Sequence, residues 1–163
     1  RHWPLLWIEE PLRCDSPVED WAALAAAAPH PLAAGENIRS HTGFSSAIIR
    51  RHLGVIQPDI CKWGGLSNCL PVARAVLKAG LRYCPHYLGG GIGLLASAHL
   101  LAAVGGDGLL EVDCNPNPLR ELLARPFPAV REGRITLSDA AGLGVEPDLD
   151  AVENLVTYRA ECR

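Results

Sequence analysis

Short apolar runs recur along this chain, and longer segments with helical features separate them. The runs are bounded by turn-forming residues and lie at residues 5–8, 32–34, 55–56, 81–84 and 109–112. Such runs are typical of strands that are buried on both faces, as they are in parallel sheets. The pattern therefore predicts a parallel sheet built from these segments.

The intervening segments carry helix signals. Ser16 is placed to cap the first helix, with Pro17 at its first helical position and Glu19 three residues after the cap. Gly54 follows the second helix as a stop signal. Pro71 is expected in the first turn of the third helix, where amide groups lack partners in any case. The predicted helices span about residues 17–28, 40–52, 67–80 and 93–104.

A polar residue ends each apolar run. These residues are Glu9, Glu36, Asp59, His86 and Glu111, and successive members are 27, 23, 27 and 25 residues apart. That interval is close to the length of one strand, one helix and two loops. In a (β/α) barrel, reactive side chains lie at the C-terminal ends of successive parallel strands and converge over one face. The spacing therefore predicts an α/β fold of TIM-barrel type with a shared site.

The length of the chain indicates only part of such a barrel. A closed eight-stranded barrel usually needs about 250 residues, whereas this chain has 163 and contains no methionine. We expect residues 1–128 to be the C-terminal part of a (β/α) barrel domain. Residues 129–163 are expected to form a C-terminal tail that packs on the barrel or on a capping domain.

Composition favours an ordinary globular protein. Hydrophobic residues make up 48% and charged residues 20% of the chain, and the net charge is -3. This balance offers no basic surface for a nucleic acid partner, and no apolar stretch is long enough for a membrane span of about 20 residues. Six cysteines without a C-x-x-C pair favour free, buried thiols over a disulfide framework or a zinc site. A cytoplasmic location is therefore expected.

Five motifs, taken together, resemble the enolase superfamily, and within it the mandelate racemase and muconate lactonizing subgroup. They lie, in order, at residues 7–11 (WIEEP), 35–37 (GEN), 57–65 (QPDICKWGG), 85–86 (PH) and 110–113 (LEVD). The similarity extends over about residues 5–148. Segments 86–93 and 111–120 are most similar to the tartrate and acid-sugar dehydratases of this subgroup.

The resemblance implies that Glu9 and Glu36 are two of three carboxylate ligands to one Mg²⁺ ion, which prefers oxygen donors. In the family this ion binds the substrate carboxylate and stabilises the enediolate that forms when the α-proton leaves. Glu10 is expected to point away from Glu9, because adjacent strand residues face opposite sides. The third ligand, an aspartate one strand earlier, has no counterpart in this sequence, and neither does a Lys-x-Lys pair.

The resemblance also implies roles in catalysis. His86 matches the general acid or base, Asp59 matches the carboxylate that hydrogen-bonds it, and Glu111 matches a residue that contacts the substrate or the enediolate. Lys62 either faces the site, where it is a candidate substrate-binding residue, or covers the barrel rim. Asn37 and Asn115 follow Glu36 and Glu111 closely and are candidate substrate-binding residues.

We therefore expect a Mg²⁺-dependent dehydratase that acts on a small-molecule carboxylate, a hydroxy acid of tartrate or acid-sugar type. A racemase or epimerase of a 2-hydroxy acid would use the same metal and the same intermediate, and it remains an alternative. A third possibility is that this chain alone is a truncated, non-catalytic fragment of an active parent. Relatives in the family are often oligomers, so a homo-oligomer is expected for the full-length form.

Overall fold

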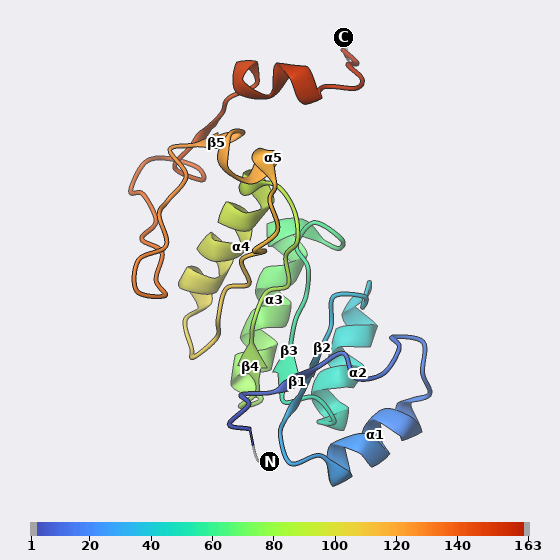
Figure 1. Ribbon diagram of the computed structural model, residues 1–163. Helices are drawn as coiled ribbons and strands as arrows, with labels where there is room; N and C mark the ends of the chain where they lie inside the picture. The colour runs from blue at the N-terminus through green and yellow to red at the C-terminus, as the bar shows by residue number, and fades with distance from the viewer. Residues whose placement is uncertain (1–2, 162–163) are drawn as a thin grey trace.

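The structure is a computed structural model that describes residues 3–161. Four strand and helix pairs follow one another, and their helices lie along the strands (Figure 1). Their bounds are β1 (Ile8–Glu9), α1 (Val18–Ala27), β2 (Leu32–Ala34), α2 (His41–Arg50), β3 (Val55–Ile56), α3 (Gly65–Lys78), β4 (Arg82–Tyr83) and α4 (Gly91–Val104). The strands form one parallel sheet in the order β1-β2-β3-β4. This succession of βα units is that of a partial barrel and confirms the predicted fold class.

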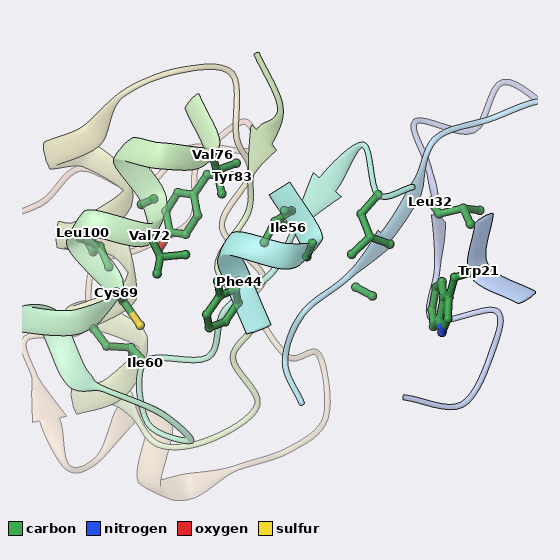
Figure 2. Close-up of a cluster of buried hydrophobic side chains, with 14 residues drawn as sticks. Trp21, Leu32, Phe44, Ile56, Ile60, Cys69, Val72, Val76, Tyr83 and Leu100 are labelled. Carbon is green, nitrogen blue, oxygen red and sulfur yellow. The ribbon is translucent and has the colours of Figure 1, made fainter. Parts of the chain in front are cut away.

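The main core lies between the sheet and its helices. Ile56 points from the sheet toward this side, where Phe44 of α2 and Val72 and Val76 of α3 lie near it, and Leu32 lies farther along the same cluster (Figure 2). All five side chains are at most 5% exposed. Alternate residues of a strand face opposite sides, so the core fixes which side chains point away from the helices.

A smaller cluster covers the other face of the sheet. Ala33, Val55 and Cys84 are buried there, and Trp7 packs against them. The guanidinium of Arg82 lies 6.0 Å from the centre of the Trp7 ring, although the two residues belong to opposite ends of the strand order. The sheet is therefore curled, as the wall of a barrel is.

The helix termini differ from the sequence prediction in detail. Helix α1 begins one residue later than expected, with Pro17 at the cap position and no side-chain cap hydrogen bond, so the prediction of Ser16 as the cap is wrong. Helix α2 has a hydroxyl cap, since Ser40 Oγ accepts from the backbone N–H of Gly43 over 3.0 Å. The helix ends at Arg51, whose backbone adopts the left-handed αL conformation, and not at the predicted Gly54.

Helix α3 begins at Gly65, before the predicted start at about residue 67. Pro71 consequently lies inside the helix, and the prediction that it occupies the first turn is wrong. The ring removes the amide that would bond the carbonyl of Ser67. Both residues are exposed, so water can satisfy that carbonyl.

The fifth predicted strand, at residues 109–112, is absent from the described structure, and this prediction is wrong. The segment does run beside β4, because the N–H of Leu109 donates to Cys84 Sγ over 3.3 Å. That bond goes to a side chain and not to a strand carbonyl, so no backbone ladder forms. Leu109 is also 49% exposed, which shows that the apolar run lacks the covering that a strand buried on both faces requires.

Little regular structure follows α4. The elements are α5 (Pro118–Glu121), the antiparallel pair of β5 (Ala124–Arg125) and β6 (Glu146–Pro147), and the short 3-10 helix η1 (Asp150–Leu155). Figure 1 shows this part extending beyond the C-terminal end of the sheet. The predicted boundary at residue 128 between barrel and tail stays a prediction.

The cysteines in the described residues are free thiols, as expected, but only Cys69 and Cys84 are buried. Cys14, Cys61 and Cys114 are exposed, so the expectation of burial is wrong for them. Cys162 lies outside the described residues. Within residues 3–161, every helix is too short or too polar to cross a bilayer.

Candidate active site

His86 lies at the centre of a group of charged side chains at the C-terminal ends of the strands. It follows β4 and is 3% exposed. Its Nδ1 lies 2.8 Å from Asp59 Oδ2, and its Nε2 lies 2.7 Å from Glu36 Oε2. Both ring nitrogens thus face carboxylate oxygens, and both can donate at once only in the imidazolium form. The structure therefore brings together three of the residues that the sequence singled out.

Asp59 orients more than the imidazole. Its second oxygen, Oδ1, accepts hydrogen bonds from the backbone N–H groups of Cys61 (2.7 Å) and Lys62 (3.0 Å). The carboxylate is 5% exposed, so these bonds supply the partners that a buried charge requires. Asp59 consequently fixes both the ring of His86 and the loop that leads into α3.

Glu36 is held at both of its oxygens. Its Oε1 lies 2.7 Å from Lys62 Nζ, while Oε2 faces His86. Gly35, directly before it, has a φ of 144°, and a Cβ at this position would lie 2.8 Å from the backbone nitrogen of Gln57. Only glycine suits this close approach of β2 to the segment after β3, and the resulting backbone path places Glu36 over the site.

Glu111 joins this group although it does not end a strand. Its Oε2 accepts from the N–H of Tyr87 over 2.9 Å and lies 3.9 Å from His86 Nε2. Burial raises the pKa of the Glu111 carboxyl, and the negative charges of Glu9 and Glu36 raise it further. Three carboxylates are therefore close enough to influence one another beside the imidazole.

Glu9 lies at the exposed side of the site, where its Oε2 accepts from Trp7 Nε1 over 3.0 Å. Glu10 lies beside Asn37, and its direction relative to Glu9 stays a prediction. It has a φ of 39°, which interrupts the extended strand, and its pKa is raised by burial and by the charge of Glu36. No sequence signal indicated this conformation.

The two asparagines differ in position. Asn37 Nδ2 lies 3.4 Å from both Glu10 Oε1 and Glu36 Oε1, at the edge of the site. Asn115 instead donates from Nδ2 to Asp113 Oδ1 over 2.7 Å and is exposed. The structure thus brings Asn37 to the carboxylates and leaves Asn115 bonded to its own loop. Substrate binding by either residue stays a prediction.

No sequence pattern singled out Tyr87 as part of the site, although it directly follows His86, the candidate general base. Its side chain is 8% exposed, and burial raises its pKa to about 12. The hydroxyl lies against Gly89 and Gly93, where a Cβ would come within 2.6 Å and 2.4 Å of it. The glycines therefore make room for a tyrosine that anchors the backbone next to His86.

The donor set suits a hard divalent cation. Mg²⁺ takes oxygen ligands and is commonly bound through one or two carboxylates, with water or substrate oxygens completing its shell. Glu9 and Glu36 come from neighbouring parallel strands, and both act electrostatically on Glu111. Within residues 3–161, no group of three or more His, Cys, Asp or Glu side chains is arranged to hold a metal ion. The carboxylate oxygens of Glu9 and Glu36 are of the chemical kind that Mg²⁺ takes as ligands.

Known proteins share this architecture. The sequence matches the family described as "Enolase C-terminal domain-like" over residues 1–151. A solved structure, the mandelate racemase/muconate lactonizing enzyme from Bordetella bronchiseptica, is 62% identical with a TM-score of 0.88, over 93% of this chain and 43% of that one.

Two curated relatives carry names that state a reaction. D-galactarolactone cycloisomerase of Agrobacterium fabrum is 32% identical in an alignment over 155 residues that covers 90% of this chain and 40% of the relative. L-talarate/galactarate dehydratase of Salmonella typhimurium is 35% identical over 141 residues, which are 86% of this chain and 33% of the relative. The chain thus spans between 33% and 43% of the length of these three proteins. It belongs to the enolase C-terminal domain-like family, which confirms the resemblance seen in the sequence.

Proposed function

We propose that the complete protein is a Mg²⁺-dependent dehydratase of a sugar acid, a hydroxy acid with a carboxylate next to the reacting carbon. The observation that carries the proposal is the position of His86 between Asp59 and Glu36, over distances of 2.8 Å and 2.7 Å. A buried imidazole that a carboxylate orients is suited to move a proton near neutral pH. The names of the dehydratase relatives, which include galactarate and arabinonate, support a sugar acid as the substrate.

His86 would act twice in this reaction. In its neutral form, with Nδ1–H donating to Asp59, Nε2 takes the proton from the carbon next to the carboxylate. The electron pair of that C–H bond becomes part of a double bond. His86 then returns a proton to the hydroxyl on the next carbon, which leaves as water. The resulting enol becomes a 2-keto-3-deoxy acid, so the net change is the loss of one water molecule.

Glu9 and Glu36 would hold the metal ion. When bound, Mg²⁺ supplies positive charge that stabilises the negative charge developing on the substrate carboxylate. Glu111, whose pKa is raised by burial, is suited to share a proton with a substrate oxygen. Asn37 lies at the edge of the same site and is positioned to meet a substrate hydroxyl.

A cycloisomerase is the second candidate. The 32% identity to D-galactarolactone cycloisomerase favours it. Its first step would be the same removal of the α-proton by His86. The two reactions then differ in the leaving group, which is a free hydroxyl in a dehydratase and a ring oxygen in a lactone.

The test is a panel of sugar acids and their lactones, incubated with the complete protein and Mg²⁺ and assayed for 2-keto acid product. A product from open-chain acids supports the dehydratase, and a product from lactones alone supports the cycloisomerase. Exchange of the α-proton for deuterium without loss of water would instead indicate the racemase or epimerase alternative. No product and no exchange with any substrate would reject the proposal.

Other expectations stay proposals. A small-molecule carboxylate substrate, a homo-oligomer and a cytoplasmic location are consistent with the reaction class. Residues 1–163 alone would count as a non-catalytic fragment if they showed neither cooperative unfolding nor stabilisation by Mg²⁺ while the complete protein showed both.

A further inference from the structure

We infer that Lys62 is a positioning residue that orients the carboxylate of Glu36 for the metal ion, and that it does not bind the substrate. The inference rests on the proposed function, because it takes Glu36 to be a metal ligand. It concerns a residue for which the sequence left two positions open, one facing the site and one covering the rim.

The contacts of Glu36 divide between its two oxygens. Oε1 receives the ammonium of Lys62 over 2.7 Å and lies 3.4 Å from Asn37 Nδ2. Oε2 faces His86 Nε2. Lys62 therefore fixes Oε1, and Oε2 is the oxygen on the side of His86, where the proposed reaction takes place. A carboxylate held in this way loses less rotational freedom when it binds a cation.

Lys62 is itself well placed for such a role. Its backbone N–H donates to Asp59 Oδ1 over 3.0 Å, and the other oxygen of Asp59 bonds His86. One buried carboxylate thus sets the start of the lysine side chain and the orientation of the imidazole. The side chain of Lys62 is 33% exposed and that of Glu36 is 22% exposed, so solvent screens the ion pair only in part.

Two opposing effects decide what removal of Lys62 does to metal binding. The ammonium repels a cation, so its loss alone would tighten binding. Loss of the hydrogen bond to Oε1 frees the ligand, and changes to the partners of metal ligands typically weaken affinity by about 10–100-fold. We expect orientation to dominate, because Lys62 is engaged with the oxygen that faces away from His86 and its charge is already paired.

The experiment measures Mg²⁺ binding to the complete protein by isothermal titration calorimetry, without substrate. Lys62→Ala is compared with the wild type, with Lys62→Gln as an uncharged side chain of similar length, and with Lys62→Arg. Lys78→Ala is the matched control, because it removes the same charge from an exposed position at the end of α3. We expect Kd to rise on the order of tenfold in Lys62→Ala and Lys62→Gln, to recover partly in Lys62→Arg, and to stay unchanged in Lys78→Ala.

Unchanged or tighter Mg²⁺ binding in both Lys62→Ala and Lys62→Gln overturns the inference while leaving the proposed function intact. An increase confined to the KM for substrate, measured at saturating Mg²⁺, assigns Lys62 to substrate binding and likewise overturns it. A wild-type protein that binds no Mg²⁺ rejects the metal-dependent function and the inference together. Lys62→Gln keeps the test valid if Lys62→Ala does not fold.

Discussion

Asp59 and His86 are 27 residues apart in the sequence, yet Asp59 Oδ2 lies 2.8 Å from His86 Nδ1 in a site where both are at most 5% exposed. They belong to the segments after β3 and β4, which are neighbours in the sheet. The hydrogen bond leaves Nε2 as the ring nitrogen that faces Glu36 and Glu111. The proposed proton transfer would therefore take place at Nε2.

Asp59→Asn is expected to lower kcat by about 10²–10⁴-fold with little loss of stability. The amide oxygen can still accept from the N–H groups of Cys61 and Lys62, as Oδ1 of Asp59 does. The amide nitrogen would then face His86 Nδ1 as a donor and favour the wrong tautomer. Steady-state kinetics and thermal unfolding of the same preparation check this. A variant with normal kcat would show that the imidazole does not depend on Asp59.

Gly35→Ala is expected to destabilise the fold by about 1–3 kcal/mol. The new Cβ would lie 2.8 Å from the backbone nitrogen of Gln57, and the position requires a φ of 144°. Gly133→Ala is the matched control, because Gly133 also has a positive φ but nothing lies within 4 Å of its Cβ position. Urea denaturation gives the free energy of unfolding. Equal losses in the two variants would mean that backbone strain alone, and not the approach of Gln57, makes glycine necessary.

Gly93→Ala tests the anchoring of Tyr87. A Cβ at this position of α4 would lie 2.4 Å from the tyrosine hydroxyl, so we expect destabilisation of about 1–3 kcal/mol by overpacking. Tyr87→Ala removes the obstacle, and the double variant should be more stable than the sum of the two single effects predicts. Strictly additive effects in this cycle would show that the two residues do not compete for the same space.

The buried thiol of Cys69 should make the free energy of unfolding depend on pH in the alkaline range. Burial raises the pKa of its thiol to about 11, from an ordinary value of 9.0. A raised pKa in the folded state contributes stability that is fully present below pH 9 and is lost as the pH rises through about 11. Cys69→Ala should therefore lose less stability than the wild type between pH 9 and 11. Thermal unfolding at each pH measures this, and identical pH profiles would contradict it.

The order of the βα units and the position of the site could be predicted from the sequence, because both follow from a repeat. Glu36, Asp59 and His86 each come soon after a short buried run, and parallel strands bring such positions to one edge. Their convergence needed no exact strand boundary. Glu111 also lies in this site, but it belongs to a loop beside β4 and does not follow a strand.

The remaining features depend on interactions that no local pattern records. The apolar run before Glu111 resembles a strand, but the N–H of Leu109 bonds the sulfur of Cys84 and no ladder forms. Glu10 adopts a φ of 39°, whereas a residue in an extended strand has a negative φ. The ion pair between Lys62 and Glu36 joins residues 26 apart, and the length of the lysine side chain allows many other positions. These contacts arise from tertiary packing.

The proposed dehydration depends most directly on His86 as the group that removes the α-proton. The decisive measurement follows the release of deuterium to water from a sugar acid labelled at the carbon next to its carboxylate, in the complete protein with Mg²⁺. We predict release with the wild type and a rate at least about 10²-fold lower with His86→Asn, while thermal unfolding stays cooperative. Release at the wild-type rate by a folded His86→Asn variant would contradict the account.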